Sequence, residues 1–260
     1  MKKRLVCILL AAALALTMCA CGSSGKYKAV KSLGRQDYSI GFRNGDSTYH
    51  YIDRALRTLS YEGTIDDLSR KWFGSDSAVD FPSKKNALDD LGYIEPRTFI
   101  IGVDLDSAPL AFQSGEEYIG FDIELAQAVC ERLGWVLKIQ PIHSEDAFVE
   151  LNSGNIDCAW GGVMLDAQSD KYTILVTYMS TDAVLAAKST DSSSIRDKQL
   201  YIGTTQYALD LLEENSSVNR KLGQITRVSG GATDYFNALD NGKCDLILTT
   251  DAAVEYFNTH

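Results

Sequence analysis

Two short segments carry residue types that suit the binding of a small charged molecule. Gly203, Thr204 and Thr205 stand directly before a helical pattern, whose first backbone N–H groups and dipole attract a carboxylate. Thr250 and Asp251 follow an apolar strand pattern, and a carboxylate there can accept charge-assisted hydrogen bonds from an ammonium group. Each segment also fits a simpler interpretation, because threonine and aspartate are common helix N-caps.

A third segment, Trp160-Gly161-Gly162, ends another strand pattern. Glycine backbone lets a ligand approach closely, and tryptophan offers a face for stacking. The alternative is a buried core tryptophan above a tight turn, since tryptophan is highly buried on average. The sequence alone leaves both interpretations open.

The chain gives little support to catalysis or metal binding. Its three histidines stand in no motif, and no Cys/His spacing typical of zinc occurs. Asp104 and Asp166 are candidate acid–base carboxylates, but no nucleophile with a neighbouring base is evident. We therefore expect no cofactor, no metal and no enzyme activity. We expect the thiols of Cys130, Cys158 and Cys244 to be buried and unpaired.

The N-terminal segment has the plan of a secretory signal. Basic residues 2–4 precede an apolar run from Leu5 to Met18. The run ends in Ala-Cys-Gly around Cys21, which resembles a bacterial lipobox and predicts a lipid anchor on Cys21 at the outer face of the membrane. Residues 1–20 would then be a signal peptide and 21–25 a tether. A cleaved signal without lipid and a retained membrane helix are the alternatives.

The charge balance excludes one large class of partners. The chain has 25 basic and 35 acidic residues, a net charge of −10. Removal of residues 2–4 leaves 22 basic against 35 acidic residues. Such a chain has no surplus of cations to neutralise phosphates, so we expect no nucleic-acid partner.

Strand patterns alternate with amphipathic helix patterns, which predicts an α/β fold with mostly parallel sheets. We expect strands at 38–42, 98–103, 136–141, 158–161, 183–187, 200–203 and 246–249. We expect helices at 47–60, 65–72 and 122–133, and after Ser144 and Thr205.

One pattern occurs twice. Phe148, Leu151, Gly154 and Asp157 recur at the same spacing as Phe236, Leu239, Gly242 and Asp245. In each copy the glycine suits a left-handed helix end and the aspartate suits a tight turn before a strand. The repetition predicts two related α/β lobes.

From Thr98 onward several motifs occur in a fixed order. They are Phe-Ile-Ile-Gly-Val-Asp at 99–104, Pro109, Gly-Phe-Asp-Ile-Glu-Leu-Ala at 120–126, the segment 151–162, Gly-Thr-Thr-Gln at 203–206, and 245–251. Together they resemble the bacterial extracellular solute-binding proteins of family 3, which serve amino-acid ABC importers. The resemblance implies a two-lobed periplasmic-binding-protein-like type II fold, a small solute in the cleft, a membrane permease as partner, and a monomer.

The resemblance also implies which residues line the cleft. They are Asp104, Ser107, Phe112, Trp160, Gly161, Gly162, Met164, Gln168, Ser169, Thr204, Thr205, Thr250 and Asp251. In the family an arginine after the glycine pair clamps the ligand carboxylate. Here Gln168 or Ser169 stands at that position and Met164 replaces a hydroxyl. A free α-amino acid is therefore one ligand among several, beside an amine, a short peptide or a carboxylate-free solute.

The motif order departs from the family. The family's C-terminal segment, with its Phe-Arg-x-Gly-Asp turn and its final Lys-Trp-Phe-Gly, stands here at 26–74 instead. We therefore predict a circular permutation, with 75–96 as the linker between the old ends. The alternatives are a truncated tandem gene and a swapped tail that completes a neighbouring molecule. Lobe 1 would be 43–184, lobe 2 would be 26–38 and 188–260, and the hinge strands 39–43 and 183–188.

Three functions follow from these observations. The first is an importer's substrate-binding lipoprotein, and the second is a sensory module with an altered pocket. The third is an enzyme on the same fold, since some relatives are small-acid dehydratases. The absence of an acid–base pair argues against the third.

Overall fold

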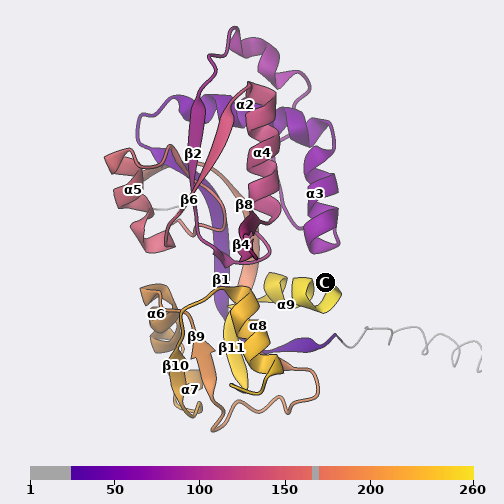
Figure 1. Cartoon of the computed structure of the whole chain (residues 1–260), viewed down its shortest axis with the longest axis vertical. Helices are drawn as coiled ribbons and strands as arrows, with labels where there is room; N and C mark the ends of the chain where they lie inside the picture. The colour runs from indigo at the N-terminus through magenta and orange to yellow at the C-terminus, as the bar shows by residue number, and fades with distance from the viewer. Residues whose placement is uncertain (1–24, 166–169) are drawn as a thin grey trace, which may run out of the picture.

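The computed structural model describes residues 25–165 and 170–260, which form two α/β lobes joined by two long strands (Figure 1). The strands are β1 (Tyr27–Arg43) and β8 (Tyr172–Lys188), which pair antiparallel from one end to the other. Each runs from one lobe into the other (Figure 1). The two-lobed α/β fold predicted from the sequence is confirmed. The predicted signal peptide and Cys21 lie outside the described residues.

Lobe 1 is a sheet covered on both faces. The parallel strands β7 (Cys158–Ala159), β2 (Thr98–Val103) and β6 (Val136–Pro141) lie beside β1. Successive side chains of a strand point to opposite faces, so Ile101 packs in the cluster of α2 (Thr48–Tyr61), α3 (Thr64–Phe73) and α4 (Phe121–Leu133). Ile100 packs instead with the cluster of α5 (Ala147–Ser153).

A short second sheet and a 3-10 turn lie at the cleft side of lobe 1. The sheet has the order β3 (Asp106–Ser107), β4 (Ala111–Ser114), β5 (Glu117–Ile119). The turn η2 (Ser144–Asp146) leads into α5.

Lobe 2 repeats the layered plan. The parallel strands β10 (Ile225–Arg227), β9 (Leu200–Ile202) and β11 (Leu246–Thr250) lie beside β8. Leu200 and Leu246 pack on the side of α6 (Gln206–Glu214) and α7 (Ser216–Asn219). Ile247 packs on the other side with α8 (Ala232–Asp240) and α9 (Asp251–Thr259).

The two lobes have the same strand order. Lobe 1 reads β6-β2-β7 and then the antiparallel β1, and lobe 2 reads β10-β9-β11 and then the antiparallel β8. The repeated sequence pattern occupies the same place in each lobe. Asp157 Oδ2 accepts from Ile100 N at 2.8 Å, and Asp245 Oδ2 accepts from Gln199 N at 2.8 Å. The sequence repeat is therefore also a structural repeat.

The joint between the lobes is the section in which β1 and β8 pair only with each other. The prediction placed a strand at 38–42, whereas β1 is continuous from Tyr27 to Arg43. Residues 41–42 already pair with β7 in lobe 1, and residues 183–186 already pair with β11 in lobe 2. Between these two regions, the section in which β1 and β8 pair only with each other runs from Arg35 to Ile40, opposite Val176 to Asp182.

The segment 75–96, predicted as a linker, is packed against lobe 1. Phe81 is buried and its ring stacks on Tyr178 at 5.3 Å. Asp80 N donates to Tyr178 O, and the turn η1 (Ala87–Leu91) begins with a fully buried alanine. Apolar residues within this polar segment therefore fix its path.

Two further expectations concern the cysteine thiols and the helices of the described residues. Cys130, Cys158 and Cys244 are buried free thiols, as expected. Within 25–165 and 170–260, every helix falls short of the length and apolar character that crossing a membrane requires.

Candidate functional site

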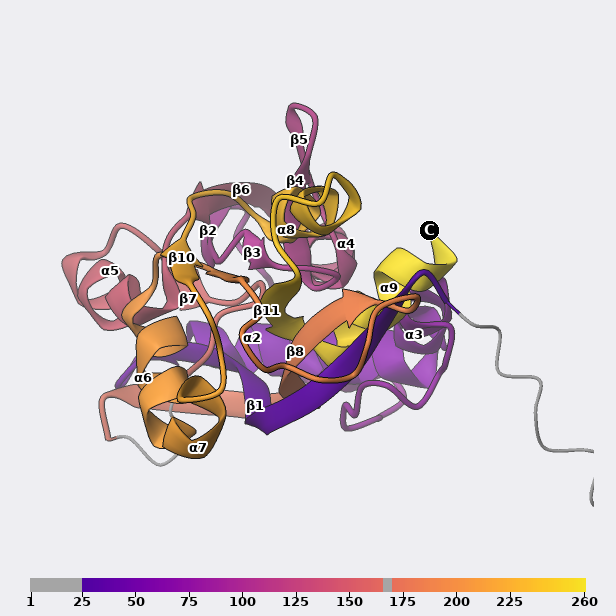
Figure 2. The same ribbon diagram turned by 90° about the horizontal axis from the view of Figure 1, so that it is seen from below.

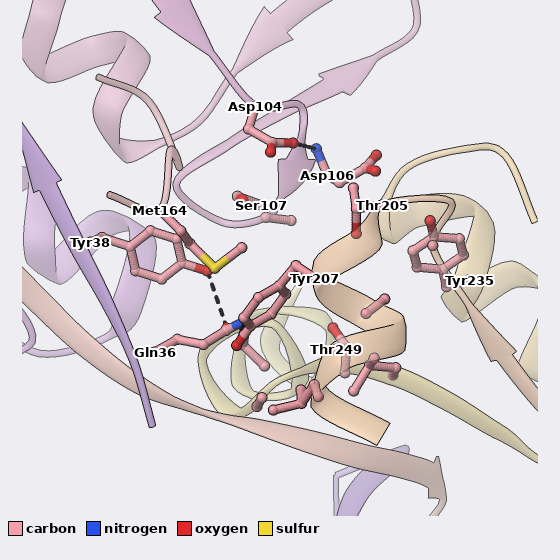
Figure 3. A pocket seen from close by; sticks show the side chains of 17 residues that line it. Gln36, Tyr38, Asp104, Asp106, Ser107, Met164, Thr205, Tyr207, Tyr235 and Thr249 are labelled. Carbon is pink, nitrogen blue, oxygen red and sulfur yellow. Dashed lines mark hydrogen bonds between the residues drawn. The ribbon is translucent and has the colours of Figure 1, made fainter. Parts of the chain in front are cut away.

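A cavity lies between the lobes, at the carboxyl ends of β2 and β11. It is lined from lobe 1, from lobe 2 and from the joining strands (Figure 3). The polar lining residues are Gln36, Tyr38, Asp104, Asp106, Ser107, Thr205, Tyr207, Tyr235, Thr249 and Thr250. Met164, Ala183, Leu211 and Leu248 are among the apolar ones. A neighbouring part of the same cleft adds Ser144, Glu145, Lys171 and Asp210.

Asp104 lines the cavity as predicted, but its carboxylate is already bonded within lobe 1. Its Oδ1 accepts from Asp106 N at 3.2 Å. Its Oδ2 accepts from Ser144 N at 2.9 Å and from Ser144 Oγ at 2.7 Å. The same hydroxyl accepts from Met164 N at 3.1 Å. Asp104 therefore fixes the loops around the cavity.

Asp106 was not singled out from the sequence, and it is the freer carboxylate of the pair. It lines the cavity, and its Oδ1 would lie 3.7 Å from a Cβ built on Gly231 of lobe 2. Burial and the nearby carboxylates of Asp104 and Asp234 raise the pKa of Asp106 to about 6, although His143 lowers it. The structure shows no hydrogen-bond donor to this carboxylate among the described residues.

Tyr235 of α8 was also missed, and it closes the lobe 2 side of the same end (Figure 3). The residue is 5% exposed, and its buried hydroxyl has no hydrogen-bond partner among the described residues. Burial and the charges of Asp106, Asp104 and Asp234 raise the pKa of this phenol. A neutral hydroxyl thus faces the acidic end of the cavity.

The start of α6 is where the sequence predicted a seat for a carboxylate, and a carboxylate of the protein lies there. Gln206 N donates to Glu145 Oε2 at 3.0 Å, so a residue of lobe 1 meets the helix N-terminus of lobe 2. Thr205 is the N-cap residue and lines the cavity. The carbonyl of Thr204 accepts from Arg227 instead, outside the cavity lining.

Trp160, Gly161 and Gly162 form a buried turn rather than a stacking face. Trp160 has no exposed surface, which confirms the core interpretation. Gly161 and Gly162 have φ values of 114° and 67°. A Cβ on Gly162 would lie 2.3 Å from Ser107 Cβ, so only glycine fits there. Ser107, which does line the cavity, donates from Oγ to Gly162 O at 2.8 Å.

Asp122, from the Gly-Phe-Asp motif, holds this turn by a hydrogen bond. Its Oδ2 accepts from Gly162 N at 2.8 Å and from Tyr178 Oη at 2.6 Å. Burial raises the pKa of Asp122 to about 7, although these hydrogen bonds oppose the shift. The motif thus ties α4 to β8 and to the turn.

Phe112 belongs to the core. It is 4% exposed and packs edge-on against Trp72 of α3 and Tyr256 of α9. Trp72 also stacks on Tyr256 at 5.7 Å. These rings join α9 to lobe 1 away from the cavity.

Thr250 and Asp251 separate in the structure. Thr250 lines the cavity and its Oγ1 caps α9 by accepting from Ala253 N at 3.1 Å. Asp251 lies in a different hollow, beside Tyr27 and Met179. Burial and the nearby Asp182 raise the pKa of Asp251. The predicted ammonium site at Asp251 is therefore not part of this cavity.

The expected position of the clamping arginine falls partly outside the structure. Gln168 and Ser169 lie outside the described residues, as does Asp166. Met164 does line the cavity. Among the described residues that line the cavity there is no arginine, and the described part of the chain has no cluster of three metal-ligating side chains.

Comparison with known proteins supports one family. The model of "Bacterial extracellular solute-binding proteins, family 3" matches residues 99–227. The arginine-binding extracellular protein ArtP of Bacillus subtilis is 20% identical over 167 residues, which are 63% of this chain and 66% of that protein. The chain thus spans slightly less than two thirds of this curated relative.

Solved structures are also similar to part of this chain. A substrate-binding protein of an ABC uptake transporter from Streptococcus pneumoniae with bound histidine has 21% identity and a TM-score of 0.47, over 62% of this chain and 68% of the other. An ancestral amino-acid-binding protein described as a precursor of cyclohexadienyl dehydratase has 18% identity and a TM-score of 0.46, over 62% and 73%. Residues 99–227, which begin with the motif at Phe99, therefore match the family 3 bacterial extracellular solute-binding proteins.

Proposed function

We propose that this protein is the extracytoplasmic substrate-binding component of an ABC importer and binds a small solute of amino-acid type between its lobes. One observation carries the proposal: the cavity is lined from both lobes and from both joining strands. A ligand there contacts both lobes and both joining strands. Its binding energy can therefore stabilise a closed arrangement of the lobes. The relatives named as amino-acid binders support the ligand class.

A lipid on Cys21 would hold the protein beside its permease. The support is the Ala-Cys-Gly sequence that ends the apolar N-terminal run. Metabolic labelling with a fatty-acid analogue tests it, and Cys21→Ser is expected to abolish labelling and release the protein.

Binding is tested directly by the melting temperature of the full chain in mild detergent against a panel of solutes. The panel contains amino acids, amines, short peptides and small carboxylates. A ligand at 100 times its Kd stabilises by about 2.7 kcal/mol, which shifts the melting temperature measurably. Silence across the panel, from a protein that melts cooperatively, would contradict the proposal.

We also propose that the chain is a circular permutant of the family. Support comes from the two ends of the fold, which lie side by side (Figure 2). Tyr27 N donates to Asn258 Oδ1 at 2.8 Å, and Asn258 Nδ2 donates to Tyr27 O at 2.9 Å. The end of α9 could therefore continue directly into β1.

A rearranged chain tests this proposal. It begins at Thr98, runs to His260, continues through a short glycine–serine link into Lys26 and ends after Gly74. We expect it to fold cooperatively and to bind the same solutes as the original chain. This rearranged chain lacks residues 75–97, so a second version that retains them after Gly74 is the control. Failure of both versions to fold would contradict the proposal.

A further inference from the structure

On the basis of the proposed function, we propose that the cleft selects an organic cation, an amine or guanidinium compound whose charge lies between Asp106 and Tyr235 and which needs no α-carboxylate. The inference concerns the class of solute, and it rests on two ends of one cleft. At the first end the protein offers an unpaired anion and an unpaired hydroxyl. At the second end the protein itself fills the place where a ligand carboxylate would bind.

The first end is acidic on both sides. Asp106 comes from lobe 1, and Asp234 lies near it in α8 of lobe 2. Asp234 is already engaged, because its Oδ2 accepts from Gly231 N at 3.2 Å. Asp104 is engaged with Ser144. Asp106 is therefore the carboxylate left to bind a cation, and a charge-assisted hydrogen bond to it is a strong one.

Tyr235 supplies the second, independent observation. A buried hydroxyl without a hydrogen-bond partner destabilises the protein, so such a group in a cavity wall points to a polar ligand. The phenol oxygen can accept from an N–H donor, which an ammonium or guanidinium group offers in excess. Tyr38 and Tyr207 add aromatic rings that line the same cavity, and such rings attract cations.

The second end explains why a carboxylate is not required. The N-terminus of α6 receives Glu145 from lobe 1 through Gln206 N. A ligand carboxylate would have to displace Glu145 and would then lie beside its negative charge. No arginine is among the described lining residues, and the cation of this part of the cleft, Lys171, stands against the three carboxylates of Asp104, Glu145 and Asp210. A zwitterionic amino acid is therefore disfavoured at the end that its carboxylate would occupy.

Matched ligand pairs test the inference. Calorimetry on the full chain in detergent compares agmatine with arginine, putrescine with ornithine, and tyramine with tyrosine, so that each pair differs by one carboxylate. We expect the decarboxylated member of at least one pair to bind at least 10-fold more tightly. Equal or tighter binding of the amino acids would overturn the inference while sustaining the proposed function. Silence from all six, and from the wider panel, would overturn both.

Variants locate the charge. Asp106→Asn is expected to weaken binding of the preferred amine by about 30-fold or more, the effect of removing one partner of a buried charge pair. Asp90→Asn is the matched control, because Asp90 is an exposed aspartate of lobe 1 outside the cleft lining and its Oδ2 accepts from Lys84 Nζ. We expect a change below about threefold for a charge so separated. Equal losses in both variants would show a general field effect and overturn the assignment of Asp106.

Glu145→Ala tests the other end. Removing this carboxylate frees Gln206 N, so we expect the preference for the amine over its amino acid to fall several-fold while the affinity for the amine changes little. An unchanged preference would show that Glu145 does not exclude the ligand carboxylate. A pH series adds a readout that packing alone would not move: affinity for a permanently protonated amine should rise as pH increases through about 6, where Asp106 ionises. Asp104, Asp234, His143 and Tyr235 face the same carboxyl group, so His143→Gln is the control for that series.

Discussion

The helix–glycine–turn–strand unit of lobe 1 ends in a buried turn, whereas its counterpart in lobe 2 ends at the cleft. Both units use a left-handed glycine, Gly154 or Gly242, and an aspartate that accepts from the backbone of the neighbouring strand. We call this shared glycine and aspartate the repeated frame. After it, β7 leads into Trp160 and Gly162, and Gly162 N donates to the buried Asp122. Strand β11 leads into Thr250, which borders the cavity. The repeated frame fixes where each strand lies, and the residues after the strand determine whether its end is buried or lines the cavity.

The largest expected effect is at the buried turn. Gly162→Ala forces a Cβ against Ser107 and an unfavourable φ, so we expect the free energy of unfolding to fall by about 3 kcal/mol or more. Chemical denaturation measures it. A loss below about 1 kcal/mol would show that the turn of lobe 1 is as adaptable as the strand end of lobe 2.

The next effect is a pH dependence centred on Asp122. Its pKa is about 7 in the fold against an ordinary value of 3.8, so the folded state holds the proton more tightly. Its contribution to stability is present below about pH 4 and is lost as pH rises through 7. Measured against wild type, Asp122→Asn should therefore gain relative stability with rising pH, by at most about 1.4 kcal/mol per unit. A difference that stays constant from pH 4 to 8 would contradict this.

The two aspartates of the repeated frame allow a direct comparison. Asp157→Ala leaves the Ile100 N–H without its acceptor and removes a contact with Arg97, so we expect a loss of about 2 kcal/mol. Asp245→Ala leaves only the more exposed Gln199 N–H, and we expect about 1 kcal/mol. Urea denaturation of both variants tests the order. A larger loss in lobe 2 would reverse the view that lobe 1 is the more tightly fixed.

The smallest effects are expected at the frame glycines. Gly154→Ala and Gly242→Ala each place a Cβ in open space at positive φ, so each should cost about 1 kcal/mol. Differential scanning calorimetry should give the two losses within about 0.5 kcal/mol of each other. Clearly unequal losses would show that the two copies share sequence spacing but not structural role.

The sequence by itself determined the local structure and the family. Strands 98–103 and 136–141 occur as predicted, and α4 begins one residue before its prediction, because periodicity and a terminal glycine are local signals. The prediction for α3 was less complete: a helix was expected over 65–72, whereas α3 runs from Thr64 to Phe73 with Gly63 as its N-cap residue. The order of the motifs is also a property of the sequence alone, so the resemblance to the family does not depend on the coordinates.

Only the tertiary structure decided which residues meet in the cleft. Asp106, Tyr235 and Glu145 lie far apart in the sequence and belong to no motif, so no local pattern distinguished them from other acidic or aromatic residues. Conversely, Trp160, Phe112 and Asp251 had suitable chemistry but are placed in the core or in another hollow. The physical reason is that a side chain's role depends on burial and on its partners. Both are set by how the two lobes come together.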